Sequence, residues 1–329
     1  MKRMMIAVMA SGIAFAAQAD VGEVVRNQIA PGFAAFDASA QTLAEAAKVE
    51  CSAQVLQGPW NAAFDAWLGV QHFHIGPSEE GGRALTIAYW PDPKTLGARQ
   101  MAAMLDAKDP ALLTPEGMDQ VSIAARGLYG IERILYGAPY AKGDYACDLV
   151  RAMSVELAAT SAGLARDWQA FEPVLTGAGE AGNTTYQSVN EARQALFTQL
   201  LVGLEFNEAT RLGRVLGSFD APRPERAEAL LSHRAERNLA LSLTALRGLA
   251  VDLALSDGAE IPLTLAAFDR ADALLGKLDD PDFAGVATPG GRLKIEILQQ
   301  AVIAARDAAE AEIGAALGVS SGFNSADGD

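Results

Sequence analysis

The chain has 329 residues, of which 50% are hydrophobic and 20% are charged, and its formal net charge is −15 at pH 7. That length is enough for one large domain or two of ordinary size. The excess of acidic residues argues against nucleic acid as a partner, and it is compatible with cations or basic ligands.

Residues 1–19 have the features of a secretory signal peptide. Two basic residues are followed by an apolar run, and the small-residue pattern Ala17-Gln18-Ala19 closes the segment. The apolar run is too short to remain as a membrane span. We therefore expect cleavage after Ala19 and a periplasmic protein without stable membrane insertion.

Apolar residues recur at helical spacing through most of the chain, and alternation with a period of two is never sustained. This pattern predicts an all-α protein. Residues 76–94, which are rich in glycine and proline, are expected to form an ordered excursion between helices. The predicted helices cover residues 32–51, 60–72, 96–106, 119–137, 145–171, 185–216, 224–255, 263–278 and 292–317.

A glycine-rich break at residues 177–182 divides the chain into two helical parts of similar size. Short connections of this kind suit helices that pack antiparallel in bundles. We therefore expect an N-terminal helical bundle over residues 20–178 and a C-terminal helical bundle over residues 179–329.

The chain has two cysteines, Cys51 and Cys147. In an exported protein such a pair favours a disulfide, because the compartment is oxidising. The bond would tie the first long helix to the helix at residues 145–171. It would close a loop of about a hundred residues, for which the chain-entropy estimate is up to about 4–5 kcal/mol.

Glu132 is an acidic residue on the apolar face of the helix that is predicted at 119–137. It lies only about 40° from Leu128 on the apolar face, and Tyr129 sits one helical turn before it. A buried carboxylate without a partner costs several kcal/mol. We therefore expect the carboxylate to contact an arginine, a tyrosine hydroxyl, a metal or a ligand. A purely structural ion pair is an equally open interpretation.

Other side chains could join Glu132 in a site. Trp60 and Trp67 share one helical face, where core packing is the default and a pocket wall is the alternative because Asn61 lies close by. Arg83, Arg234 and Arg237 are cations that could pair with Glu132.

The sequence contains few of the motifs that are typical of enzymes. It has no nucleophile elbow, no glycine-rich phosphate loop and no HExxH zinc helix. Only three histidines occur, and His72 and His74 are two positions apart, which on a helix points them to different sides. They could share a metal ion only if the helix ends there.

The stretch Gly127-Leu128-Tyr129-Gly130-Ile131-Glu132 resembles the G-x-H-x-x-E signature of the imelysin family of bacterial exported proteins. Residues 60–77, WNAAFDAWLGVQHFHIGP, are similar to the family's first Trp-rich helix, and residues 212–243 resemble a segment of its second half. Together with the signature, these similarities extend over most of the mature chain.

The resemblance implies a duplicated four-helix-bundle architecture, with a polar pocket where two bundles meet. The family is named for a peptidase and is linked to iron-regulated and iron-uptake proteins. Glu132 and His74 become candidate ligands of iron or another divalent metal. The residues expected to line the pocket are Trp60, Asn61, Trp67, His74, Arg83, Tyr129, Glu132, Arg234 and Arg237.

This sequence departs from the signature at Tyr129, which stands where the family has histidine. A tyrosine ligates ferric iron only once it is deprotonated, from a pKa near 10, whereas it readily donates a hydrogen bond to a carboxylate. Hydrolysis by a metal bound to this pair is therefore disfavoured. We expect Glu132 to be held by Tyr129 and one or more arginines.

The functional hypothesis is an exported imelysin-like binding protein that takes a small ligand or a metal ion. Its role would be linked to the uptake of iron or another metal, with an uptake system or another exported protein as a partner. Two alternatives stay open. One is a metallopeptidase, and the other is a helical module that binds a protein and has no small ligand.

Overall fold

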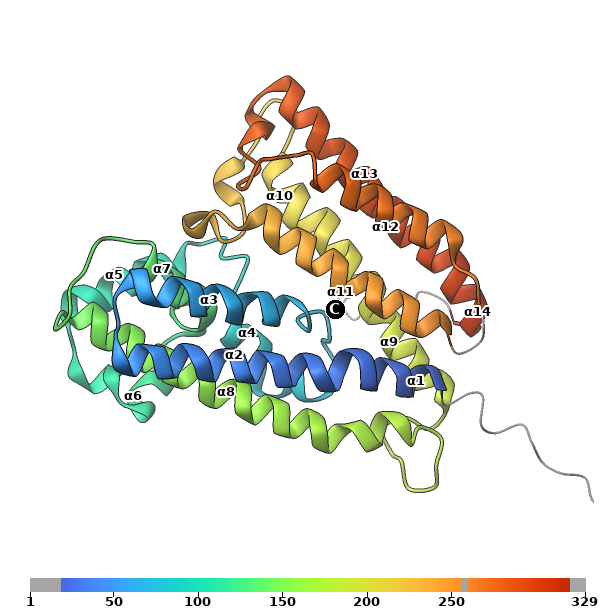
Figure 1. Cartoon of the computed structure of the whole chain (residues 1–329), viewed down its shortest axis with the longest axis horizontal. Helices are drawn as coiled ribbons and strands as arrows, with labels where there is room; N and C mark the ends of the chain where they lie inside the picture. Colours follow the sequence, from blue (N-terminus) through green and yellow to red (C-terminus); the bar gives the residue numbers. More distant parts are fainter. Residues whose placement is uncertain (1–18, 256–258, 320–329) are drawn as a thin grey trace, which may run out of the picture.

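The computed structural model describes residues 19–255 and 259–319, and these residues fold into a set of long and short helices (Figure 1). Apart from one isolated bridge between Ser218 and Ala221, no β-structure occurs in these two ranges. The all-α prediction is therefore confirmed. Of the predicted signal peptide, only Ala19 lies within the described residues.

The first half of the chain is built around α2 (Ala30–Val49), which contacts both α3 (Ala53–Leu68) and α8 (Tyr145–Thr176) (Figure 1). The apolar stripe of α2 faces these two helices and includes the buried rings of Phe33 and Phe36. The shorter elements of this half are α1 (Ala19–Val24), a π-helical turn (Val25–Ile29), α4 (Arg83–Ile87), α5 (Leu96–Ala107), α6 (Pro115–Asp119) and α7 (Gly127–Leu135).

In the second half, α11 (Ala235–Leu255) contacts α9 (Val189–Glu205) and α12 (Pro262–Leu275), and α12 packs along α13 (Pro289–Ala309). The remaining elements are a π-helical turn (Phe206–Leu212) that leads into α10 (Gly213–Leu216) and a second one (Glu310–Gly314) that leads into α14 (Ala315–Leu317).

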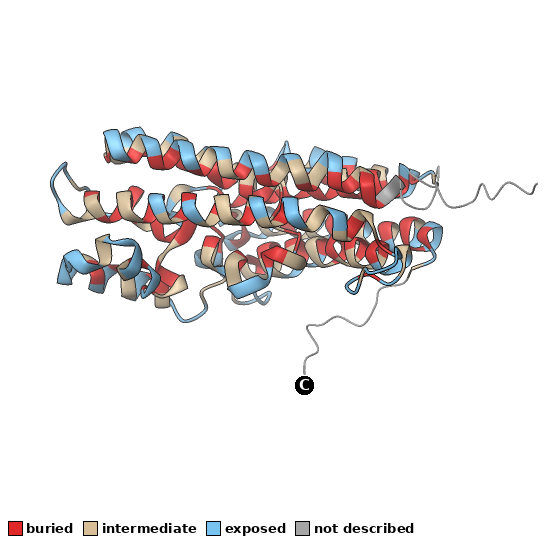
Figure 2. Cartoon of the chain, turned by 90° about the horizontal axis from the view of Figure 1, so that it is seen from below, coloured by how far each residue is buried: buried red, intermediate tan, exposed pale blue. Residues whose placement is uncertain are grey.

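The two halves share one core. Buried apolar side chains form a single cluster that runs through both, and each helix is buried along its inner side (Figure 2). The start of the chain also joins the halves, because the side chains of Asn27 and Gln28 donate hydrogen bonds to Asp252 of α11 at 2.9 and 2.8 Å. The predicted boundary after residue 178 falls in the connection between α8 and α9. The division into separate bundles stays a prediction.

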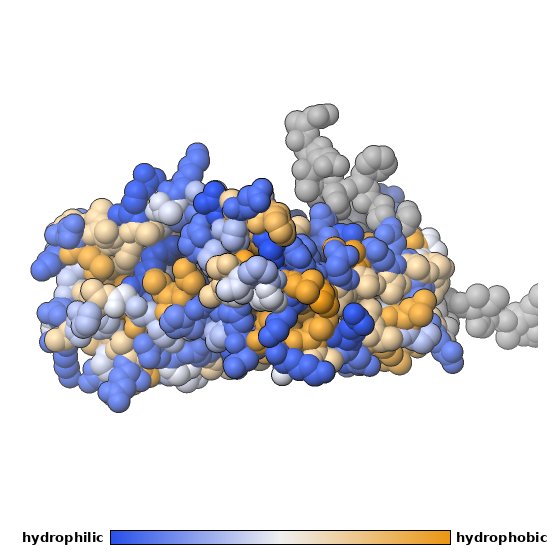
Figure 3. Space-filling model, turned by 90° about the horizontal axis from the view of Figure 1, so that it is seen from above, coloured by the Kyte–Doolittle hydropathy of each residue, from blue (hydrophilic) through white to orange (hydrophobic). Residues whose placement is uncertain are grey.

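Helix α11 is the one helix within the described ranges that is long and apolar enough to cross a membrane, and 56% of its most apolar window is buried inside the protein. Burial of that kind is typical of the core helix of a globular fold. On the face shown in Figure 3, hydrophobic side chains form small patches among hydrophilic ones.

Two predicted helices begin two or more helical turns before the observed ones. The segment at 224–255 becomes helical only at Ala235, because residues 224–234 form 3-10 turns in which Ala229 and His233 have positive φ. The helix expected at 119–137 begins at Gly127, where φ is +64° and an added Cβ would lie 2.3 Å from the carbonyl oxygen of Ile87. The excursion at 76–94 is confirmed as irregular in the main, but it contains α4.

The disulfide between Cys51 and Cys147 is confirmed. It joins the second residue after the end of α2 to the first turn of α8, across a sequence separation of 96 residues. Both residues are only 1% exposed, so the bond is part of the core of the first half.

Replacing both cysteines with alanine is expected to lower the free energy of unfolding by about 2–4 kcal/mol, because the unfolded chain loses its longest covalent constraint. Urea denaturation at pH 7 measures this loss. Native protein that has been reduced should unfold at about the same urea concentration as the double variant. Equal midpoints for oxidised protein and double variant would contradict the prediction.

Candidate functional site

The candidate site lies where α3 and α7 of the first half meet residues 224–234 and the π-helical turn Phe206–Leu212 of the second half. A π-helical turn inserts one residue into a helix and is frequent at functional sites. Residues 224–234 bring their side chains to the seam as an irregular segment, which is why helical periodicity does not describe them.

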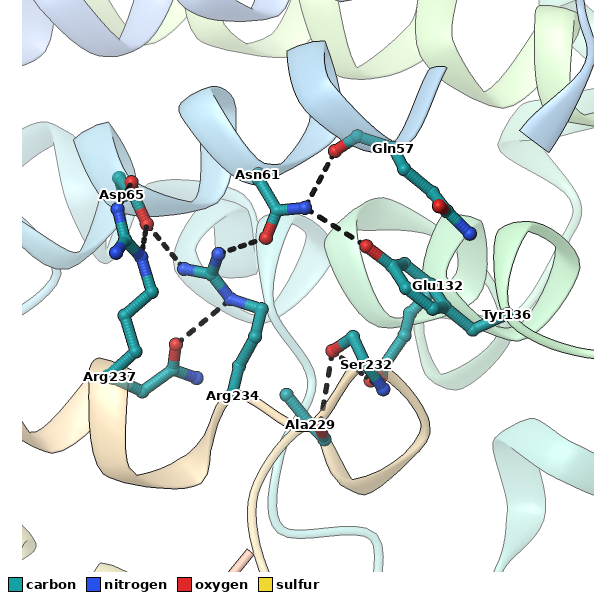
Figure 4. Close-up of polar contacts among 10 residues, drawn as sticks. Gln57, Asn61, Asp65, Glu132, Tyr136, Ala229, Ser232, Arg234 and Arg237 are labelled. Carbon is teal, nitrogen blue, oxygen red and sulfur yellow. Dashed lines mark hydrogen bonds and ion pairs between the residues drawn. The ribbon is translucent and has the colours of Figure 1, made fainter. Parts of the chain in front are cut away.

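Glu132 is buried at this seam, with 4% of its surface exposed. Its Oε1 atom accepts hydrogen bonds from the backbone N–H of Ser232 at 3.0 Å and from the Ser232 hydroxyl at 2.6 Å (Figure 4). Burial raises the pKa of Glu132 above its ordinary value, although both hydrogen bonds from Ser232 oppose the rise. The expectation that Tyr129 and an arginine hold Glu132 is wrong, because Ser232 fills that role.

Tyr129 instead faces a second buried acid, Glu228. The Tyr129 hydroxyl donates to Glu228 Oε1 at 2.7 Å. Arg211 approaches the same carboxylate with two nitrogens, Nε to Oε2 at 2.7 Å and Nη2 to Oε1 at 3.0 Å. Arg211 is 1% exposed and Glu228 is 3% exposed. This bidentate ion pair is therefore almost completely removed from water.

The pKa values of the two acidic groups in this cluster are shifted in opposite directions. Burial acts to raise the pKa of Glu228, but Arg211 and the Tyr129 hydroxyl outweigh it and hold the pKa below its ordinary value. Burial, together with the charge of Glu228, raises the pKa of Tyr129 well above 10. At neutral pH the cluster consists of a carboxylate, a guanidinium and a neutral phenol.

Further polar groups complete the cluster. Arg211 Nη1 donates to Asn207 Oδ1 at 2.7 Å, and Asn207 Nδ2 donates to the hydroxyl of Ser242 in α11 at 2.9 Å. Asn207 and Arg211 both belong to the π-helical turn. The hydrogen bonds therefore run without interruption from α7 to α11.

Asn61, Arg234 and Arg237 do come together, but around Asp65 and not around Glu132 (Figure 4). Arg234 is 3% exposed, donates to Asn61, and reaches Asp65 Oδ1 at 2.5 Å. Arg237 reaches the same oxygen at 3.0 Å. Burial acts to raise the pKa of Asp65, but the two arginines outweigh it and lower the pKa.

A cavity of about 180 Å³ lies beside the contact between Tyr129 and Glu228. Residues of both halves line it, and we call it the seam cavity. Its aromatic walls are Trp67, Trp90 and Phe206. Its polar lining consists of Gln71, His72, His74, Tyr129, Glu228 and Ser242.

His72 is the polar group of the seam cavity whose hydrogen bonds are unmade. It is 5% exposed, and neither ring nitrogen has a hydrogen-bond partner within the described part of the chain. Burial lowers the pKa of His72 to about 3, so the imidazole is neutral at pH 7 and offers one donor and one acceptor. Each unmade bond of a buried polar atom costs about 1–3 kcal/mol.

The predicted site residues are thus distributed over several places. Trp67, His74 and Tyr129 line the seam cavity. Trp60 is a core residue whose Nε1 donates to the carbonyl of Leu128 at 3.0 Å. Arg83 pairs with Asp167 of α8 at 2.5 Å and lines a groove of the first half.

The donor atoms at the seam do not fit a directly bound metal ion. Glu132 is not among the described residues that line the seam cavity, so the predicted pair of Glu132 and His74 is not assembled there. The Tyr129 phenol keeps its proton, and both oxygens of Glu228 already accept hydrogen bonds. Across residues 19–255 and 259–319, no group of three or more His, Cys, Asp or Glu side chains is placed to hold a metal ion.

Sequence reasoning missed Arg211, Glu228, Ser232 and the role of His72. Glu228 and Ser232 lie in a segment that was predicted to be helical, where a polar residue is assigned to the solvent face by default. No glycine or proline lies between Pro224 and Arg234, so the sequence carries no helix-breaking signal for this irregular segment.

Residues 29–309 match the family described as imelysin, which is a peptidase family by name. The chain belongs to the imelysin family. No curated protein matches it. Among solved structures, it is similar to an imelysin-like protein from Psychrobacter arcticum, with a TM-score of 0.80 and 20% identity over 97% of this chain and 100% of that one.

A second similar structure is a putative iron-regulated protein A precursor from Parabacteroides distasonis. The TM-score is 0.72, the identity is 12%, and the match covers 94% of this chain and 96% of that one. At these identities the two structures support the imelysin fold.

Glu132→Gln and Glu228→Gln form a matched pair of substitutions at the seam. In Glu132→Gln the amide would keep the oxygen that accepts both bonds from Ser232 and remove a buried charge, so the free energy of unfolding should change by less than about 1 kcal/mol. Glu228→Gln leaves the buried Arg211 charge unpaired and should cost about 3–5 kcal/mol. Urea denaturation at pH 7 compares them. A larger loss in Glu132→Gln would show that the roles are assigned wrongly.

Acidification should destabilise the protein through His72. The pKa of His72 is depressed in the folded state, so its contribution to stability is complete above about 6.5 and is lost as the pH falls from 6.5 toward 3. The slope is at most about 1.4 kcal/mol per pH unit. Urea denaturation at pH 7, 6 and 5 should show a smaller loss in His72→Phe. Parallel curves for the two proteins would contradict this account.

Proposed function

We propose that this imelysin family member is an exported binding protein that holds a small ligand in the seam cavity. The observation that carries the proposal is His72, a buried neutral imidazole that lines the cavity with both nitrogens unpaired among the described residues. A ligand that forms a hydrogen bond with one of these nitrogens would recover part of the hydrogen-bond energy that is missing in the folded protein.

The size of the cavity limits the ligand. A cavity of about 150 Å³ holds benzene, and the seam cavity measures about 180 Å³. The proposed ligand is therefore about the size of a six-membered ring with one or two substituents. Pockets for larger organic ligands usually measure about 300–1,000 Å³.

The lining also limits the charge and shape of the ligand. The charge of Glu228 is compensated by Arg211, and His72 is neutral at pH 7. The indoles of Trp67 and Trp90 and the ring of Phe206 provide flat apolar walls. These features favour a planar, uncharged molecule with a hydrogen-bond donor or acceptor at its edge.

A link to iron is part of the proposal. It is supported by the likeness to the putative iron-regulated protein A precursor. Because the donor atoms at the seam do not suit a bare metal ion, we place the link at a small organic ligand within an iron-related or other metal-related uptake process. The predicted signal peptide supports a periplasmic location, where an uptake system or another exported protein would be the partner.

The metallopeptidase alternative receives less support from the same site. A hydrolytic metal needs about three protein ligands and an open coordination position. No such group occurs in the described ranges. The volume of the seam cavity is also below that of a bound peptide.

The proposal is tested with planar fragments of up to about ten non-hydrogen atoms, including benzamide and imidazole, in a thermal-shift screen of the mature protein. We expect a subset to raise the Tm in a saturable way. His72→Phe keeps the ring shape and removes both nitrogens, so it should weaken these fragments by about tenfold or more. A screen without hits, or hits that His72→Phe binds equally well, would refute the proposal.

Calorimetric titration with ferric, ferrous, zinc and copper ions provides the complementary experiment. We expect no stoichiometric binding to the native protein and no change in Glu132→Ala. Stoichiometric binding that is lost in Glu132→Ala would instead establish a metal site at Glu132.

A further inference from the structure

The hydroxyl of Ser242 lies at the end of a chain of hydrogen bonds that reaches the seam cavity. Arg211 Nη1 donates to Asn207 Oδ1 at 2.7 Å, and Asn207 Nδ2 donates to Ser242 Oγ at 2.9 Å. Both bonds are oriented from the guanidinium toward Ser242, which lines the cavity. Because Ser242 is only 2% exposed, any further partner of its hydroxyl has to lie inside the protein or in the cavity.

The hydroxyl proton of Ser242 has no acceptor among the described residues. A serine hydroxyl carries one donor and two acceptor lone pairs. In Ser242 the oxygen accepts the bond from Asn207, and no hydrogen bond donated by this hydroxyl occurs in the part of the chain that the structure describes. Other helical hydroxyls behave differently: Ser154 and Thr244 donate to the carbonyl oxygen four residues earlier, at 2.7 and 2.9 Å. The O–H of Ser242 is therefore available to a molecule in the cavity.

The direction of the chain makes this hydroxyl a better donor than acceptor. A hydroxyl oxygen that already accepts a hydrogen bond is polarised, and the bond that it donates becomes stronger. The neutral imidazole of His72 offers one donor and one acceptor, and so does the amide of Gln71. Tyr129 and Glu228 are bonded to each other at 2.7 Å. Ser242 thus adds a polar group with a preferred direction to a cavity whose other free groups are indifferent.

We propose that Ser242 determines the specificity of the seam cavity, and that the ligand is a planar molecule with a carbonyl oxygen or a pyridine-type nitrogen that accepts the Ser242 proton. This inference rests on the proposed function, because it names the chemical class of the ligand for the same cavity. A planar molecule whose polar group is only a donor, such as a pyrrole, leaves the buried hydroxyl proton without a partner. Such a molecule is disfavoured for that reason.

Acetophenone and α-methylstyrene are a matched pair of probes, because they have the same shape and differ only in a carbonyl oxygen that is replaced by a methylene group. Both are titrated into the mature protein by calorimetry at pH 7. Ser242→Ala should weaken acetophenone by about fivefold or more. The same variant should bind α-methylstyrene at least as tightly as the native protein, since this probe cannot accept the proton.

Ser242→Ala is a mild substitution for the fold. Asn207 Nδ2 keeps its second hydrogen bond, to the carbonyl oxygen of Gly203 at 3.0 Å, so the Tm of the free variant should stay close to that of the native protein. Its binding of α-methylstyrene shows in addition that the cavity is intact. Ser154→Ala is the matched control, because Ser154 is a buried serine of α8 that does not line the cavity. It should bind both probes like the native protein.

His72→Phe separates this inference from the proposed function. Weaker binding of acetophenone in His72→Phe, together with native affinity in Ser242→Ala, would overturn the inference and leave the proposed function standing. An equal loss of both probes in Ser242→Ala would overturn the inference as well, as would an equal loss of acetophenone in Ser154→Ala. So would failure of acetophenone to bind a protein that binds other planar fragments. If no planar fragment binds, the proposed function and the inference are both refuted.

Discussion

The ion pair between Arg211 and Glu228 is the interaction on which the seam depends. The side chain of Arg211 is 1% exposed and that of Glu228 is 3% exposed. These buried charges are stabilised because the guanidinium contacts the carboxylate with two nitrogens. In addition, Tyr129 donates a hydrogen bond to Glu228, and Asn207 accepts one from Arg211. A buried pair with incomplete hydrogen bonding would not offset its desolvation. The same contacts fix α7, the π-helical turn and residues 224–234 relative to one another, and so they shape the cavity beside them.

Tyrosine at the signature position gives the site a different chemistry from that of a histidine. An imidazole and a carboxylate one helical turn apart could share a metal ion. Tyr129 keeps its proton and donates a hydrogen bond to Glu228, while Glu132 accepts from Ser232. The two signature positions therefore serve separate polar clusters. The proposed role of the seam, recognition of a hydrogen-bonding ligand, suits this arrangement better than coordination of a cation does.

The helices, the disulfide and the burial of Glu132 could be predicted from the sequence because each leaves a local signal, such as apolar spacing or an even pair of cysteines. The partners at the seam could not. Tyr129 and Glu228 are 99 residues apart, and Glu132 and Ser232 are 100 residues apart. Helical periodicity reports which face of a segment is buried, but not which residue meets it. Residues 224–234 moreover leave the helical pattern at the point where they supply Glu228 and Ser232.

The polar group that the fold leaves unpaired at the seam is a neutral imidazole and not a charged side chain. An unpaired buried charge costs several kcal/mol, and the charges of Glu132, Glu228 and Arg234 are paired or hydrogen-bonded accordingly. A neutral imidazole with unmade bonds costs about 1–3 kcal/mol per atom, a loss that a large shared core can tolerate. In the proposed function, a ligand that bonds to His72 would remove part of that cost. An unpaired neutral imidazole would thus favour binding at a smaller cost in stability than an unpaired charge.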